Sequence, residues 1–314
     1  MLGGIKLKIY KHYNENSSMT LFHGDCLNLL KEIPDNTVDL IITSPPYCMK
    51  KAYENPTDDI NTFKDLHNRI FDDIYRILKP GGSLCWQIGY HVSNAAIIPL
   101  DYLVYDIFTS KNSEIEIPLI LRNRIIWTFG HGLNSTQRFS GRHEMLLWFT
   151  KGEQYTFDLD SVRVPQKYPG KRHYKGEHKG ELSGNPLGKN PSDVWDIPNV
   201  KANHIEKTEH PCQFPCAIPQ RLIRALTSED GIVLDPFMGS GTTALAAFIE
   251  GRRFIGAEIQ SAYYDISVTR VKEAQKGNFH IREDVPVMKP DSNMAVAKLP
   301  EEFRIARECK DEEN

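Results

Sequence analysis

Residues 231–259 read GIVLDPFMGSGTTALAAFIEGRRFIGAEI, and they combine two apolar runs with a glycine-rich turn and a run of small residues. The apolar runs at 231–237 and 252–259 predict strands, and TTALAAFIEG between them predicts a helix. A strand, a helix and a second strand in this order favour a βαβ unit with parallel strands. This stretch therefore predicts an α/β fold with a mostly parallel sheet.

The same alternation occurs near the N-terminus. Apolar and amphipathic spacing predicts, in order, a strand, a short helix, a strand, a long helix and a strand at 20–25, 26–33, 38–43, 63–78 and 83–89. Lys79-Pro80-Gly81-Gly82 is expected to stop the long helix before the last of these strands. Further helices are predicted at 218–228 and 262–275. We expect one twisted sheet with helices on both faces.

The middle of the chain lacks this regular alternation. Residues 127–209 are rich in Gly, Pro, Lys, Arg and aromatic residues. The segments MLLWFT at 145–150 and YTFDLD at 155–160 predict a hairpin joined by KGEQ. Long irregular stretches inside a compact domain are usually functional, so we interpret 127–209 as an inserted recognition region.

The bulk composition is that of an ordinary globular protein. The chain has 314 residues, of which 40% are hydrophobic and 25% charged. It contains no apolar run long enough to span a bilayer, and the first residues lack the apolar core of a signal peptide. We therefore expect a cytoplasmic location and no membrane partner.

The six cysteines are scattered through the chain and predict free thiols. His210, Cys212 and Cys216 lie near one another, but Pro211 and Pro215 interrupt them and no second ligand pair follows. Zinc sites normally use paired ligands at short spacing. We predict no metal site.

Positive charge gathers in one part of a chain whose net charge is only −3. Residues 163–189 hold seven Lys or Arg against two acids, a local charge of +5, together with His and Tyr side chains. A solvated loop would look similar, but basic and aromatic residues in this mixture also suit phosphates and bases.

The glycine-rich turn DPFMGSGTT at 235–243 predicts a ligand site, because glycine lets a ligand approach the backbone at a helix N-terminus. The lysine of a nucleotide-triphosphate loop is absent, which excludes that ligand. A dinucleotide remains an alternative, although Ala244 stands where its third glycine is usual. The third candidate is S-adenosylmethionine, with Asp235 placed to meet its ammonium group. Glu258, about twenty residues on, suits the ribose hydroxyls of either ligand.

A second motif is TSPPY at 43–47, which ends the predicted strand VDLIIT. Two prolines supply no backbone donors and fix two φ angles, while Ser44 brings a hydroxyl and Tyr47 an aromatic ring. By itself, Pro45-Pro46 is equally consistent with a simple strand end.

Together the two motifs resemble those of the DNA amino-methyltransferases, which methylate adenine N6 or cytosine N4. TSPPY is similar to that family's catalytic motif, DPFMGSGTT to its cofactor loop, and His210-Pro211 through Phe214-Pro215 to a segment that flanks the cofactor. Catalytic motif first, recognition region next and cofactor loop last resembles the circularly permuted beta-type group. The resemblance covers roughly residues 20 to 275.

This resemblance implies a Rossmann-like fold, S-adenosylmethionine as cofactor and double-stranded DNA as partner. It implies that the exocyclic amine donates to Ser44 and to the carbonyl of Pro45, and that Tyr47 stacks on a flipped base. The implied catalytic residues are Ser44, Pro45, Pro46 and Tyr47. The implied cofactor-binding residues are Asp25, Asp235, Pro236, Phe237, Gly239, Gly241, Thr242, Thr243 and Glu258. Basic residues predict the DNA contacts: Lys50, Lys51, Arg122, Arg124, Arg138, Arg142, Lys167, Lys171, Arg172 and Lys175.

The resemblance also divides the chain into segments. We expect a catalytic half at 1–126, a target-recognition region at 127–209, a cofactor-binding half at 210–275 and a charged tail at 276–314. A restriction–modification role is implied, with a cognate endonuclease and a homodimer as further partners by analogy.

Several alternatives compete with this interpretation. Cytosine C5 methylation needs a nucleophilic cysteine, and neither Cys212 nor Cys216 follows a predicted catalytic strand. Protein glutamine methyltransferases place the cofactor loop before their Asn-Pro-Pro-Tyr motif. RNA methylation and a non-catalytic DNA-binding module stay open as more distant alternatives. Ser44 before Pro-Pro favours cytosine N4 as the target, with adenine N6 as the alternative.

Overall fold

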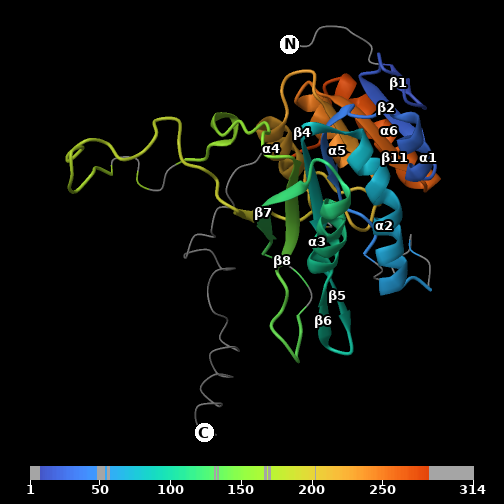
Figure 1. Ribbon diagram of the computed structural model, residues 1–314, viewed down its shortest axis with the longest axis horizontal. Coiled ribbons are helices and arrows are strands. Elements are labelled where there is room, and N and C mark those ends of the chain that lie inside the picture. The colour runs from blue at the N-terminus through green and yellow to red at the C-terminus, as the bar shows by residue number, and fades with distance from the viewer. Residues whose placement is uncertain are drawn as a thin grey trace, which may run out of the picture. The chain divides into compact units, whose positions relative to one another are not determined.

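The computed structural model describes residues 8–47, 54, 57–130, 132, 134–165, 168, 171–201 and 203–282. Its central feature is a nine-stranded sheet in the order β1-β2-β11-β10-β3-β4-β8-β7-β9 (Figure 1). The strands β8 and β4, and β8 and β7, are antiparallel, whereas the other neighbouring pairs are parallel. The α/β fold with a mostly parallel sheet is confirmed.

The bounds of the elements follow the chain. The sheet strands are β1 (Ile9–Tyr10), β2 (Met19–His23), β3 (Val38–Thr43), β4 (Leu78–Ile88), β7 (Leu119–Thr128), β8 (His143–Lys151), β9 (Val194–Asp196), β10 (Ile232–Asp235) and β11 (Arg253–Glu258). A separate hairpin pairs β5 (Tyr90–Ser93) with β6 (Ala96–Pro99). The helices are α1 (Cys26–Glu32), α2 (Ile60–Ile77), α3 (Leu100–Ser110), α4 (Ala217–Leu226), α5 (Thr242–Ile249) and α6 (Ser261–Gln275), with short 3-10 turns η1 (Lys111–Glu114) and η2 (Asp160–Val162).

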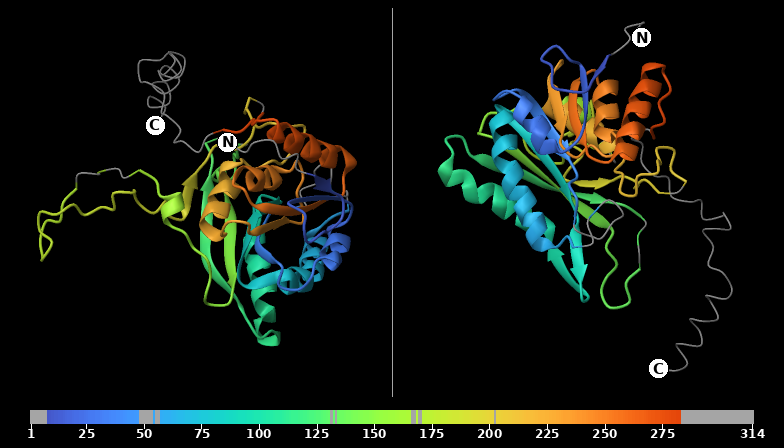
Figure 2. Two further views of the ribbon diagram at one scale, coloured as in Figure 1. Left: turned by 90° about the horizontal axis from the view of Figure 1, so that it is seen from above. Right: turned by 90° about the vertical axis from the view of Figure 1, so that its right-hand side faces the viewer.

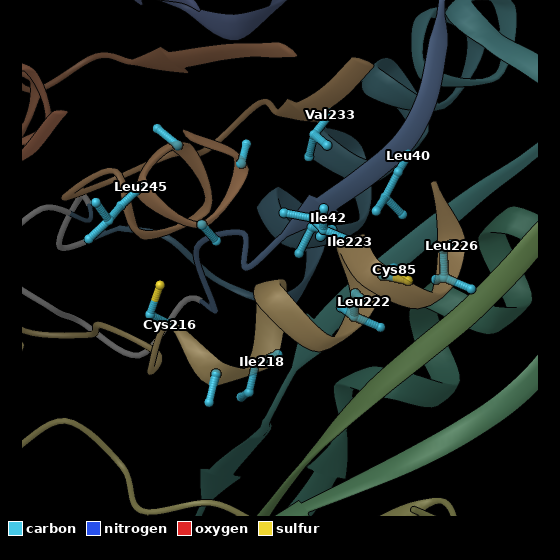
Figure 3. Packing of buried hydrophobic residues seen from close by; sticks show 14 of the residues in the cluster. Leu40, Ile42, Cys85, Cys216, Ile218, Leu222, Ile223, Leu226, Val233 and Leu245 are labelled. Carbon is cyan, nitrogen blue, oxygen red and sulfur yellow. The ribbon is translucent and has the colours of Figure 1, made fainter. Parts of the chain in front are cut away.

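Helices cover both faces of the sheet (Figure 2). Side chains of α4, α5 and α6 form one apolar cluster with the strands, and those of α1, α2 and α3 form the other. Alternation along β3 divides the two: Leu40 and Ile42 belong to the α4 side and Ile41 to the opposite side. Figure 3 shows Ile223 of α4 beside Ile42. Burying one such side chain stabilises the fold by about 1.5–3 kcal/mol.

Two local predictions were wrong. The segment Lys79–Gly82 is part of β4 rather than a loop, because its pairing with β3 shifts register between Val38 and Leu40 and Gly81 takes a φ of +79°. Residues 155–160 form no strand beside β8. That hairpin is excluded because β4 and β7 already occupy both edges of β8.

The region expected to be an insertion lies partly in the sheet. Its start at 127 falls inside β7, and β8 is a central strand. The described residues of 163–193 leave the sheet and come together at two bridges, Val164 with Lys189 and Arg172 with Leu182. We call 163–193 the basic arm. The boundaries of the four predicted segments stay predictions. Among the described residues, no helix is long and apolar enough to cross a membrane.

Candidate functional site

A cavity of about 720 Å³ lies where β2, β3, β4, β10 and β11 end. The carboxyl ends of neighbouring parallel strands form the usual ligand crevice of an open α/β sheet. Ten of the predicted catalytic and cofactor residues line it: Asp25, Ser44, Pro45, Pro46, Tyr47, Pro236, Phe237, Gly239, Thr242 and Glu258. The structure thus brings the two sequence motifs to one cavity.

Three predicted cofactor residues lie behind the wall of the cavity rather than on it. Asp235, Gly241 and Thr243 are buried and do not belong to the lining. The carboxylate of Asp235 accepts from the hydroxyl of Thr43 at 2.6 Å, from the hydroxyl of Thr243 at 2.6 Å and from the backbone N–H of Phe237 at 3.1 Å. Asp235 therefore joins the two motifs, since Thr43 ends β3 and Thr243 begins α5.

The environment of Asp235 changes its acidity. Burial raises the pKa of this carboxyl to about 6, although the hydrogen bonds from Thr243 and Thr43 oppose the shift. Sequence reasoning missed Thr43 as a partner of Asp235, because the two residues are 192 positions apart along the chain.

The two glycines of the turn have different structural reasons. Both adopt left-handed backbone, with φ of +50° at Gly239 and +75° at Gly241. A Cβ on Gly239 would lie 3.0 Å from Nε2 of His210, on the cavity side. A Cβ on Gly241 would lie 2.7 Å from Cβ of Ser267. Close approach at Gly241 is therefore to helix α6.

A buried arginine supports this turn from below. One Nη of Arg270 donates to the backbone oxygen of Ser240 at 2.9 Å and to the hydroxyl of Thr242 at 3.0 Å. Burial lowers the pKa of Arg270, against the attraction of nearby acidic groups. Sequence reasoning missed Arg270, because it looks like any arginine on a surface helix.

His210 contacts the same turn in a neutral form. Burial lowers the pKa of its imidazole to about 4, and the charges of Lys207 and Arg270 add to the shift. Its Nδ1 accepts from the backbone N–H of Cys212 at 3.2 Å. A neutral ring that accepts at Nδ1 carries its proton at Nε2, the atom that faces Gly239.

Two carboxylates border the cavity at the ends of β2 and β11. Glu258 accepts from the backbone N–H of Gln260 at 2.7 Å, and burial raises its pKa. Asp25 caps α1 by accepting from the backbone N–H of Leu27 at 2.9 Å. These hydrogen bonds fix both carboxylates beside the glycine turn, which suits a ligand with hydroxyl or ammonium groups.

The first motif is connected to two residues that sequence reasoning missed. The hydroxyl of Tyr47 lies 3.0 Å from that of Ser44 and 2.8 Å from Oε1 of Gln87. Nε2 of Gln87 in turn donates to Glu144. Gln87 lies near the end of β4 and Glu144 near the start of β8, which pair in the sheet. No local pattern marks them, because their proximity depends on strand order.

Several predicted DNA contacts already have partners within the protein. Arg122 donates to the hydroxyl of Thr150 and to the backbone oxygens of Gly152 and Glu153. Arg124 forms an ion pair of 2.6 Å with Asp101. These contacts give both arginines a role in joining β7 to its neighbours.

The other predicted DNA contacts lie on loops or outside the described residues. Arg138 and Arg142 belong to the loop between β7 and β8, and Arg142 donates to Asn134 at 2.7 Å. Lys171, Arg172 and Lys175 are exposed on the basic arm. Lys50, Lys51 and Lys167 lie outside the residues that the structure describes.

The cysteines near His210 differ in exposure. Cys216 is buried, and burial raises the pKa of its thiol far above the ordinary value. A thiol in such surroundings is a poor nucleophile. Cys212 is exposed at the cavity.

Comparison with known proteins adds a family to this geometry. The sequence profile N6_N4_Mtase, described as DNA methylase, matches residues 38–269. Type II methyltransferase M.BglII of Bacillus subtilis is 48% identical over 248 residues, 79% of this chain and 67% of the relative. Type II methyltransferase M.ScaI of Streptomyces caespitosus is 40% identical over 87% of this chain and 88% of the relative. DNA adenine methyltransferase YhdJ of Escherichia coli (strain K12) is 30% identical over 88% and 95%.

Solved structures share the fold. The PvuII DNA methyltransferase (cytosine-N4-specific) superposes with a TM-score of 0.61 at 23% identity, covering 79% of this chain and 84% of that chain. A DNA modification methylase of Thermus thermophilus, complexed with S-adenosyl-L-methionine, gives a TM-score of 0.54 at 24% identity, over 82% and 95%.

Proposed function

This chain belongs to the N6/N4 DNA methylase family of restriction–modification methyltransferases, and we propose that it methylates cytosine N4 in double-stranded DNA. The observation that carries this proposal is the meeting of TSPPY and DPFMGSGTT at one cavity, joined through Thr43, Asp235 and Thr243. A nucleophile and a methyl donor must be held together for transfer, and adjacent strand ends do this.

The cavity suits S-adenosylmethionine, the cofactor of this family. Glu258 and Asp25 offer carboxylates beside the turn, and residues 236–243 contain no Lys or Arg that would favour a phosphate. Glu258 would accept the ribose hydroxyls, and Gly239 would let the ligand approach the backbone. When bound, the cofactor supplies an electrophilic sulfonium methyl.

The protein's part in the reaction is to orient the amine. An exocyclic amine on an aromatic base is a weak nucleophile, because its lone pair is delocalised into the ring. The hydroxyl oxygen of Ser44 and the carbonyl of Pro45 would accept its two N–H groups and direct the remaining lone pair toward the methyl group. Placement of this kind supplies much of a transfer rate without a covalent intermediate.

The choice of base is the finer part of the proposal. Serine before Pro-Pro resembles the cytosine-N4 group, where the adenine-N6 enzymes usually have Asp or Asn. The 30% identity to a relative named for adenine supports adenine N6 as the second candidate. A cognate endonuclease, a homodimer and a cytoplasmic location belong to the proposal as well.

Methylation-aware sequencing of DNA from cells that express the protein tests the proposal. We expect N4-methylcytosine in one sequence context, absent from cells that express Ser44→Ala. N6-methyladenine would transfer the function to the second candidate. Unmodified DNA together with methylated RNA from the same cells would overturn DNA as the substrate.

A further inference from the structure

We propose that Glu144 and Gln87 are positioning residues that set the hydrogen-bond polarity of Ser44, so that its oxygen faces the target amine as an acceptor. This inference rests on the proposed function. It starts from a chain of four side chains that all line the cavity: Ser44, Tyr47, Gln87 and Glu144. A serine hydroxyl both donates and accepts, so its usefulness depends on where its proton points.

The polarity is set at the far end of the chain. A carboxylate only accepts, so the group of Gln87 that faces Glu144 must be its NH₂. The opposite end of the amide, Oε1, then faces the hydroxyl of Tyr47 at 2.8 Å. The backbone oxygen of Gln87 lies 3.3 Å from the same hydroxyl. Both atoms of Gln87 near Tyr47 are therefore acceptors.

The consequence passes along the chain to Ser44. Tyr47 has one proton, and the two acceptors on Gln87 direct it toward β4. The phenolic oxygen is then an acceptor for the hydroxyl of Ser44, 3.0 Å away. With its own proton committed to Tyr47, Ser44 presents lone pairs to the cavity. Chains of this kind strengthen each bond in a poorly hydrated site, and Gln87 is only 3% exposed.

A carboxylate or amide before Pro-Pro offers an acceptor oxygen whatever its neighbours do. Serine needs its proton directed away from the amine, and Glu144 provides the direction from 57 residues beyond Gln87. The inference thus explains how a hydroxyl serves at this position.

The test is a double-mutant cycle between Glu144 and Ser44, measured as single-turnover methyl transfer to a duplex that contains the site found by sequencing. Glu144→Gln lets the amide of Gln87 turn over, and we expect the rate to fall about tenfold, the usual effect of one misdirected hydrogen bond. Tyr47→Phe keeps the ring and removes the relay, with a similar expected loss. Glu229→Gln, in an exposed loop, is the matched control.

The decisive result is non-additivity. In the Ser44→Ala background, Glu144→Gln should cause no further loss, because the oxygen whose polarity it sets is gone. The Kd of S-adenosylmethionine should stay at the wild-type value in each variant. Losses that add in the double variant, or an unaffected rate in Glu144→Gln, would overturn the inference. If Glu144→Gln does not fold, the Tyr47→Phe and Ser44→Ala cycle decides in the same way. Failure of the wild type to methylate the duplex would instead contradict the proposed function.

Discussion

At the residue scale, the site depends on side chains whose surroundings override their ordinary chemistry. The sequence predicts that Asp235 meets the cofactor, yet its carboxylate is buried and accepts three hydrogen bonds from the protein. Ser44 and Tyr47 are predicted to act on the base directly, and in the structure they also bond each other and Gln87. The residue types are readable from the motifs, whereas their partners are not.

Ser44→Ala tests the catalytic motif. Removing one transition-state acceptor should lower methyl transfer by about 100-fold, while the Kd of S-adenosylmethionine stays unchanged. Single-turnover kinetics and calorimetric titration give the two quantities. Ser228→Ala, in an exposed turn, should leave both at wild-type values. Substantial residual transfer in Ser44→Ala would count against this mechanism.

Asp235 provides a pH prediction. Its folded-state pKa is raised from 3.8 to about 6, so the native state holds a proton that the unfolded state has lost. The associated stability is complete below pH 3.8 and is lost as the pH rises through about 6. The free energy of unfolding of the wild type minus that of Asp235→Asn should fall by about 3 kcal/mol between about pH 4 and pH 7. Urea unfolding at both pH values measures this difference, and a constant or rising difference would contradict the assigned shift.

At the element scale, the glycine turn is held as much by helix packing as by any ligand. Gly241 begins α5 in a left-handed conformation and lies against Ser267 of α6. Arg270, about one turn further along α6, donates to Ser240 and Thr242. The strand–turn–helix pattern is predictable from local sequence, but the support from α6 comes from a separate element.

Gly241→Ala and Gly251→Ala form a matched pair. Both positions have positive φ, +75° and +66°, but a Cβ at Gly251 meets no atom within 4 Å. We expect Gly251→Ala to cost about 1 kcal/mol for left-handed backbone, and Gly241→Ala about 1–3 kcal/mol more because of the clash with Ser267. Denaturant unfolding measures both. Adding Ser267→Gly to Gly241→Ala should recover part of the extra loss; equal costs at the two glycines would rule out the packing explanation.

At the scale of the whole molecule, positive charge is placed away from the sheet. The net charge is only −3, yet Lys171 and Lys175 are exposed on the basic arm. Arg172 is also on the arm, where it donates to the backbone oxygen of Gly180 at 2.6 Å. The two lysines therefore test charge, while Arg172 also supports the arm's own structure.

Replacing Lys171 and Lys175 with Gln should weaken DNA binding and flatten its salt dependence. Removing one phosphate contact lowers the slope of log K against log[salt] by about 0.9, so a change of about 2 is expected for two lysines. Fluorescence anisotropy at several salt concentrations measures the slope. The same replacements at Lys31 of α1 and Lys272 of α6, both exposed, are the control. An unchanged slope in the arm variant would remove the arm from the DNA interface.

The types of the elements and the two motifs at strand ends could be predicted from the chain alone, because hydrophobic period and turn chemistry are local properties. The choice of neighbouring strands could not, and it comes from tertiary packing. That order puts Thr43 beside Asp235 across 192 residues and Gln87 beside Glu144 across 57. It also denies β8 the hairpin partner predicted at 155–160. Neighbouring strands are selected by burial of the whole sheet between two helical layers, and no short stretch of sequence contains that information.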